Sequence, residues 1–164
     1  MAVETKVGVY CAADEEIRGA LDLEALEKVA LGEVKAALWR THEKISSAEG
    51  VELIRADIES EGLNRVVVLD RSHRAHPNLF DFGPDVMVEQ VPLRELVVWT
   101  HEPGDEDTQM LAEDTLRMFV AKVRNIEPPR PKEPEVERRV LVVGGGVAGM
   151  RSALDAAGAG LEVM

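Results

Sequence analysis

A glycine-rich turn near the carboxyl end of the chain constrains the fold more than any other feature. An apolar run, Val140–Val143, leads directly into Gly144-Gly145-Gly146-Val147-Ala148-Gly149, which has the spacing G-x-G-x-x-G, and a helical segment follows it. This order of strand, glycine turn and helix is typical of the first unit of a Rossmann domain. We therefore predict that residues 138–164 are the start of a dinucleotide-binding domain.

Each glycine at a motif position has a mechanical reason to be there. Gly144 permits the tight turn off the strand, Gly146 lets the backbone approach a pyrophosphate, and Gly149 lets the helix pack closely on the strand. The helix N-terminus offers free N–H groups and the positive end of its dipole to the phosphates. The predicted cofactor-binding residues are Gly144, Gly145, Gly146, Val147, Ala148 and Gly149. The alternative is a glycine-rich turn that binds no ligand.

Only part of a dinucleotide site is expected from this segment. The helix is predicted to end at Gly158–Gly160, and the second strand to begin at Leu161–Val163. The acidic residue that binds the ribose belongs at the end of that second strand, roughly 20 residues after the glycines. The sequence ends before such a residue, so we expect that this segment cannot form a sheet of its own, and that it is a truncation, pairs with another chain or is disordered.

Strands and helices alternate in the part of the chain that precedes this segment. The candidate strands are Val7–Tyr10, Val34–Trp39, Arg65–Leu69 and Leu93–Trp99, and the candidate helices are Leu23–Ala30, ended by Gly32, then Ala48–Glu61 and Asp105–Arg124. Arg65–Leu69 contains the β-branched run that is typical of a strand buried on both faces of a parallel sheet. We predict an α/β domain over residues 1–126, with a parallel or mixed sheet, flanking helices and a loop over His73–Val91.

Composition limits the compartment and the partners. Residues 127–137 are rich in proline, which is typical of a semi-rigid linker, so we place the domain boundary there. The formal charge of −12 argues against nucleic-acid backbones and anionic membrane surfaces as partners. No apolar run approaches the roughly 18 residues of a membrane helix. With one cysteine, Cys11, and no signal-peptide pattern, a cytoplasmic protein is expected.

Taken in order, several segments resemble the N-terminal region of heterodisulfide-reductase-A-like proteins, the iron–sulfur A subunits of CoB–CoM heterodisulfide reductase. The matching stretches are Val7–Cys11, Glu52–Ile54, Glu61–Val68, Arg94–Glu95 with Trp99 and His101, Arg117–Met118 with Ala121–Lys122, and Gly144–Met150 with Ala153–Leu154. The resemblance covers nearly the whole chain. It implies that the glycine turn belongs to an FAD site rather than an NAD site.

The resemblance also implies an iron–sulfur module in the first domain, and here the chain departs from the family. The family has a C-x-C after the first strand and further cysteines before the second helix, after the Val-Val-Val strand and later. This chain keeps Cys11 but has Ala13, Ser46, Arg71 and Val97 at the other positions. A [4Fe–4S] cluster normally needs four thiolates, so we expect no cluster. Cys11 is interpreted as a small buried hydrophobe at a strand end.

Polar side chains gather where the predicted strands end. The carboxyl end of Arg65–Leu69 leads into Asp70, at the edge where α/β sheets place their sites. The four histidines are expected at the same edge: His42, His73, His76 and His101. Asp70 with two of them can in principle chelate a divalent ion, but solvated loop residues are the simpler interpretation, and we predict no metal site. Arg71 and Arg74 are interpreted as salt-bridge partners.

The leading functional hypothesis is a component or fragment of a heterodisulfide-reductase-A-like flavoprotein that transfers electrons within a redox complex. Its partners would be other subunits of that complex or a second copy of itself. The alternative is a non-catalytic scaffolding module with a vestigial dinucleotide loop. No catalytic residue is predicted, because there is no nucleophile elbow and no acid–base pair. The acidic runs Asp14–Glu16 and Asp105–Asp107 are interpreted as helix starts or solvated faces.

Overall fold

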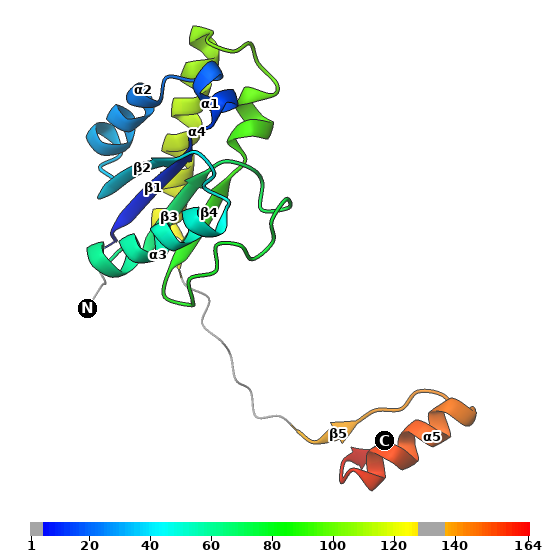
Figure 1. The fold of residues 1–164 in the computed structure, drawn as a ribbon. Helices are drawn as coiled ribbons and strands as arrows, with labels where there is room; N and C mark the ends of the chain where they lie inside the picture. Colours follow the sequence, from blue (N-terminus) through cyan, green and yellow to red (C-terminus); the bar gives the residue numbers. More distant parts are fainter. Residues whose placement is uncertain (1–4, 128–136) are drawn as a thin grey trace. The chain divides into compact units, whose positions relative to one another are not determined.

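A computed structural model describes residues 5–127 and 137–164 of the chain. The chain divides into two compact units, residues 1–129 and 130–164 (Figure 1). The proline-rich segment predicted as a linker over residues 127–137 lies almost entirely outside the described residues. No helix among the described residues is long and apolar enough to cross a membrane.

The first unit is built on a four-stranded parallel sheet with the strand order β2-β1-β3-β4. The strands are β1 (Val7–Ala12), β2 (Leu38–His42), β3 (Arg65–Leu69) and β4 (Met87–Val91). Val9 of β1 pairs with Trp39 on one side and with Val67 on the other. Both central strands are buried almost throughout, as expected for a sheet covered on two faces. The predicted α/β class and the parallel sheet are confirmed.

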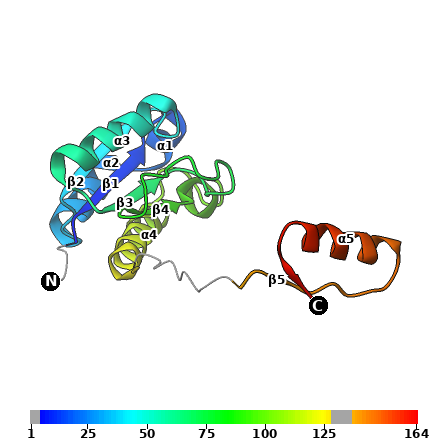
Figure 2. The ribbon, with the colours of Figure 1, turned by 90° about the horizontal axis from the view of Figure 1, so that it is seen from below.

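Helices lie on both faces because the first two crossovers run in opposite directions across the sheet. The connection from β1 to β2 contains α1 (Glu15–Ala20), α2 (Leu23–Lys28) and the π-helical turn η1 (Val29–Glu33), whereas β2 leads to β3 through α3 (Ala48–Glu61). Right-handed crossovers of opposite direction must occupy opposite faces. The long helix α4 (Glu106–Asn125) packs on β3 and β4 and contacts α2, while α3 covers the other face (Figure 2).

Local sequence signals set the helix ends. The side chains of Asp22, Ser47 and Asp105 accept hydrogen bonds from backbone N–H groups at the starts of α2, α3 and α4, and such caps each contribute about 1 kcal/mol. Helix α3 ends at Gly62, whose φ of 65° is the left-handed conformation that glycine adopts without strain. The predicted bounds Ala48–Glu61 are therefore confirmed, and the helix predicted over 105–124 is shifted by one residue.

The second strand begins later than predicted. The chain turns through η1 as far as Glu33, so Gly32 lies inside that turn and does not end the helix. Lys35 then adopts a left-handed φ of 51°, which interrupts extended backbone. The strand predicted over Val34–Trp39 is therefore observed at Leu38–His42.

Two further predictions are wrong in the region after β3. The segment Leu93–Trp99, predicted as a strand, forms the π-helical turn η2 (Arg94–Val98). Leu93 and Val97 are four residues apart, and both are buried, so one helical face enters the core. The end of the predicted loop His73–Val91 forms β4 (Met87–Val91), the edge strand that pairs with β3.

The second unit contains β5 (Arg139–Val140), α5 (Val147–Gly158) and β6 (Glu162–Val163). The two short strands pair in parallel, with Arg139 opposite Glu162. The expectation that this segment cannot form a sheet of its own is therefore wrong, because a β–α–β crossover already supplies two parallel strands. The first strand is shorter than the predicted Val140–Val143. Large apolar side chains of this unit remain exposed: Leu141, Val143, Val147, Met150, Leu154 and Met164.

Helix α3 starts so close to the preceding turn that its third residue must be glycine. A Cβ at Gly50 would lie 2.2 Å from the carbonyl oxygen of Ile45, whereas a Cβ at Gly19 in α1 meets nothing within 4 Å. We expect Gly50→Ala to lower the free energy of unfolding by about 2 kcal/mol or more, because backbone must move. Gly19→Ala should raise it by about 0.5 kcal/mol. Urea denaturation of both variants tests this, and equal effects would contradict it.

Candidate functional site

The strand order places a topological switch point between β1 and β3, where the connections that leave the sheet run in opposite directions. Open α/β sheets bind ligands at the carboxyl ends of their strands at such a point. A hollow of about 240 Å³ opens there in the first unit. Side chains from four segments line it, among them Asp14, Ser46, Asp70, Arg71, His76 and Arg94.

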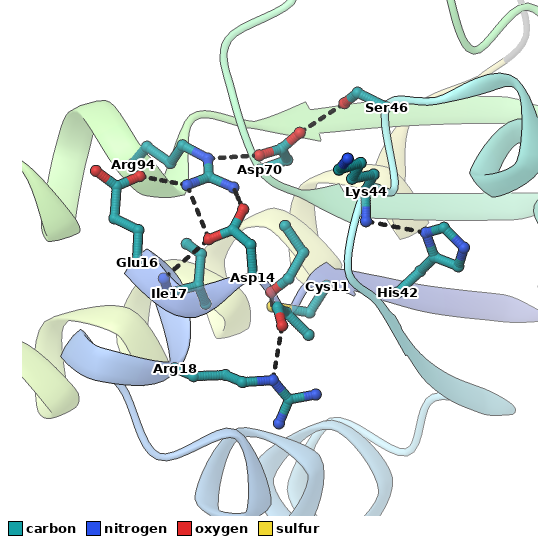
Figure 3. A network of polar contacts seen from close by, with 12 residues as sticks. Cys11, Asp14, Glu16, Ile17, Arg18, His42, Lys44, Ser46, Asp70 and Arg94 are labelled. Atoms are coloured by element: carbon teal, nitrogen blue, oxygen red, sulfur yellow. Dashed lines mark hydrogen bonds and ion pairs between the residues drawn. The ribbon is translucent and has the colours of Figure 1, made fainter.

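Arg94 of η2 is the centre of the polar contacts at this edge (Figure 3). Its side chain is only 5% exposed, and three carboxylates surround it. Nε donates to Oδ1 of Asp70 at 2.6 Å. Nη1 and Nη2 both donate to Asp14, and Nη1 also donates to Glu16. Ser46 joins the same group through Asp70, so we call Arg94, Asp14, Glu16, Asp70 and Ser46 the Arg94 network.

Asp70 links the end of β3 to two other segments. Its second oxygen, Oδ2, accepts a hydrogen bond from Oγ of Ser46 at 2.5 Å, in the turn before α3. Its backbone carbonyl accepts the N–H of Arg94 at 3.1 Å. The carboxylate is 9% exposed, and both of its oxygens have hydrogen-bond donors. Burial of this charge is therefore compensated by polar contacts on each side.

The electrostatics of the network favour its ionised form. Burial raises the pKa of Asp14, but hydrogen bonds from Arg94 and from the N–H of Ile17 outweigh it, and the net pKa lies below the usual 3.8. Burial also disfavours the charged form of Arg94, yet its hydrogen bonds to Asp14 and Asp70 raise the pKa of the guanidinium above its ordinary value. The sequence interpretation of Asp14 as a helix start is confirmed, since it caps α1. Its contact with Arg94 was not predicted.

The network continues outward to the surface. Glu16 accepts a hydrogen bond from Nε1 of Trp99 at 2.9 Å, and the guanidinium of Arg71 lies 5.9 Å from the centre of the Trp99 ring. Within residues 5–127 and 137–164 no ion pair involves Arg71 or Arg74. The salt bridges expected for these two arginines are therefore not formed in this part of the chain.

The positions that the resemblance assigned to cysteine ligands lie at this edge. Cys11 is at the end of β1, with 0% exposure, and its Sγ contacts the carbonyl oxygen of Ala12 at 3.2 Å. Ser46 and Arg71 line the hollow, and Val97 is buried in η2. Ala13, Ser46, Arg71 and Val97 carry a methyl group, a hydroxyl, a guanidinium and an isopropyl group. None of these groups is a thiolate. The residues present do not fit a [4Fe–4S] cluster.

The histidines do not converge on a metal. His76 lines the hollow at the switch point, whereas His73 lines a separate hollow beside Phe82. His42 accepts the N–H of Lys44 through Nδ1 at 3.1 Å, and Nδ1 of His101 lies 2.9 Å from Oγ1 of Thr100. In the described part of the chain, no three histidine, cysteine, aspartate or glutamate side chains are placed to hold a metal ion. The possible chelation by Asp70, His73 and His76 is not supported.

The glycine turn of the second unit has the geometry that its motif implies. Gly144 has a φ of 116°, a conformation that residues with side chains rarely adopt. A Cβ at Gly149 would lie 2.0 Å from the carbonyl oxygen of Gly144, so the helix approaches the turn closely. Gly146 precedes α5, has no side chain to cap it, and a Cβ there would meet nothing within 4 Å. The residues present fit a pyrophosphate at the N-terminus of α5.

The chain is similar in sequence to proteins named as A subunits of heterodisulfide reductases. It is 35% identical over 98% of its length to a heterodisulfide reductase A-like protein of Archaeoglobus profundus, of which it spans 24%. It is 36% identical over 97% of its length to the A subunit of H(2):CoB-CoM heterodisulfide,ferredoxin reductase of Methanothermobacter thermautotrophicus, spanning 25%. An iron-sulfur A subunit of CoB--CoM heterodisulfide reductase from Methanopyrus kandleri is 34% identical over 98% of the chain, which spans 26% of it.

The resemblance inferred from the sequence is thereby confirmed. The chain is a homologue of the A subunits of heterodisulfide reductases and spans about a quarter of the length of the curated relatives that it matches. No protein-family model matches it.

The environment of Cys11 predicts an unreactive thiol. Burial, followed by the nearby Asp70 carboxylate, raises its pKa from the usual 9.0 to about 12. Because the thiolate is the nucleophile, we expect the folded protein at pH 8 to react with Ellman's reagent far more slowly than the urea-unfolded protein. Rapid labelling of the folded protein would contradict the buried placement.

The raised pKa of Cys11 also predicts that the free energy of unfolding falls as pH rises above 9, because the unfolded chain loses the thiol proton first. This fall in stability should be smaller in Cys11→Ala.

Proposed function

We propose that the chain functions as part of an electron-transferring flavoprotein of the heterodisulfide-reductase-A type. In this proposal its second unit supplies the pyrophosphate-binding turn of an FAD site. The observation that carries the proposal is the glycine turn Gly144–Gly149, which leads into α5 in a chain homologous to these proteins along nearly its whole length.

The backbone geometry of the turn supports binding of a pyrophosphate. Gly144 turns the chain, and the close contact between Gly149 and Gly144 holds the start of α5 against the turn. The first N–H groups of a helix have no partner within the helix, and no side chain of Gly146 caps them. Those donors and the positive end of the helix dipole favour an anionic group at this point. Ribose and flavin contacts must come from outside the turn.

The first unit supplies structure and contacts rather than a redox centre in this proposal. Its single thiol is buried, and Asp14, Ser46, Asp70 and Arg94 at the switch point form one hydrogen-bonded group. The relatives are named as A subunits of heterodisulfide reductases. We therefore propose that the partners are other subunits of a redox complex, with a second copy of the chain as the alternative partner.

The test is the response of the glycine turn to ligands in the full chain. FAD or ADP should shift the backbone amide NMR signals of Gly144, Gly146 and Gly149, whereas riboflavin, which has no pyrophosphate, should leave them unchanged. Gly146→Val should abolish the response by placing a side chain where the phosphates bind. Gly158→Val is the matched control, because a Cβ at Gly158 also meets nothing within 4 Å and lies at the far end of α5.

Equal shifts with FAD and riboflavin, or no shift with FAD in a folded protein, would contradict FAD binding by this turn. A colourless, folded protein whose glycine-turn amide signals do not shift with FAD would favour the scaffolding alternative, in which the loop is vestigial.

A further inference from the structure

We infer that the Arg94 network holds together the four segments at the carboxyl edge of the sheet in place of a metal cluster, so that the first unit keeps its fold without iron. The side chains found at the ligand positions implied by the family resemblance cannot bind a cluster, whether or not the second unit binds FAD.

The members of the network come from four segments that are distant in sequence. Asp14 follows β1, Ser46 lies in the turn before α3, Asp70 follows β3, and Arg94 lies in η2. The four positions at which the resemblance places further cysteines lie in the same segments, within three residues of these side chains: Ala13, Ser46, Arg71 and Val97. One connected group of hydrogen bonds therefore joins the segments that a four-thiolate cluster would join.

A guanidinium is suited to this task. It presents five N–H donors in a rigid plane, so one side chain can bind carboxylates that approach from different directions. In this unit the Nε of Arg94 donates a hydrogen bond to Asp70, and its two terminal nitrogens donate to Asp14 and Glu16. Ser46 extends the connection to a fourth segment through the other oxygen of Asp70. A lysine offers a single point charge and cannot make the same set of contacts.

The contacts that the carboxylates already make also oppose a bound metal. The carboxylates that could attract a cation are already paired with the buried guanidinium, which would repel one. Asp14 and Glu16 are 31% and 49% exposed, so water stabilises the charge that Arg94 does not neutralise. The one thiol, Cys11, is fully buried at the end of β1.

Arg117 provides a matched control for Arg94. It also pairs with three carboxylates, Glu33, Glu113 and Asp114, but on the surface of α4, where its side chain is 33% exposed. Exposed ion pairs contribute little to stability, whereas loss of one partner from a buried pair is strongly destabilising. The two substitutions Arg94→Met and Arg117→Met therefore remove the same number of ion pairs from different environments.

The experiment measures thermal unfolding and metal content of the full chain. We expect the melting temperature to fall by about 10 °C or more in Arg94→Met and by less than about 3 °C in Arg117→Met. The wild-type melting temperature should be the same after expression with iron or with an iron chelator, and the purified protein should contain no stoichiometric iron or sulfide. Amide hydrogen exchange should accelerate together at residues 12–16, 43–47 and 70–73 in Arg94→Met.

Milder variants keep the test decisive if Arg94→Met does not fold. Ser46→Ala removes one hydrogen bond to Asp70 and should accelerate exchange mainly at residues 43–47. Arg94→Lys keeps the charge but should fail to restore wild-type stability. Equal effects of Arg94→Met and Arg117→Met, or a melting temperature that depends on iron, would overturn the inference.

Discussion

The first unit depends on one buried cation at the carboxyl edge of its sheet. The strand order brings together the turns after β1 and β3, the turn before α3, and η2. Apolar side chains such as Ile45 and Val97 anchor these segments in the core, and one polar side chain links them outside it. Arg94 does so through Asp14, Glu16 and Asp70. A buried charge is tolerated only when it is fully paired, so the guanidinium fixes the geometry of every segment that contacts it. At the edge that commonly binds ligands in this architecture, this network lines a hollow of about 240 Å³.

The two units differ in how far they fit the cofactors that the family resemblance implies. In the second unit, Gly144 has a positive φ and Gly149 allows close packing of α5, so the backbone suits a pyrophosphate. In the first unit, alanine, serine, arginine and valine stand at the positions that the resemblance implies for cluster ligands. The parallel sheet does not need thiolates there, because strands and helices make its core, whereas a cluster does. The chain therefore combines a glycine turn that fits a pyrophosphate with a first unit whose side chains do not fit a [4Fe–4S] cluster.

Local signals made much of the fold predictable. The helix Ala48–Glu61 has a serine cap and a terminal glycine, and β3 has an unbroken β-branched run, so their bounds are confirmed. The segment 93–99 is wrongly predicted as a strand because its β-branched residues suit a strand as well as a buried helical turn. Arg94, the centre of the network, lies in that helical turn, so the strand prediction gives no sign of its contact with Asp70. Asp70 was placed at the correct edge by strand topology, but its partners are distant in sequence and no local pattern reveals them.

A double-mutant cycle between Arg94 and Asp70 measures how strongly the buried guanidinium and carboxylate stabilise each other. Urea unfolding would be measured for the wild type, Arg94→Met, Asp70→Asn and the double variant. If the guanidinium and the carboxylate stabilise each other in the buried network, the two substitutions are not additive, and the coupling free energy is about 1.5 kcal/mol or more. Effects that add to within about 0.5 kcal/mol would show that the two groups act independently and would contradict the account.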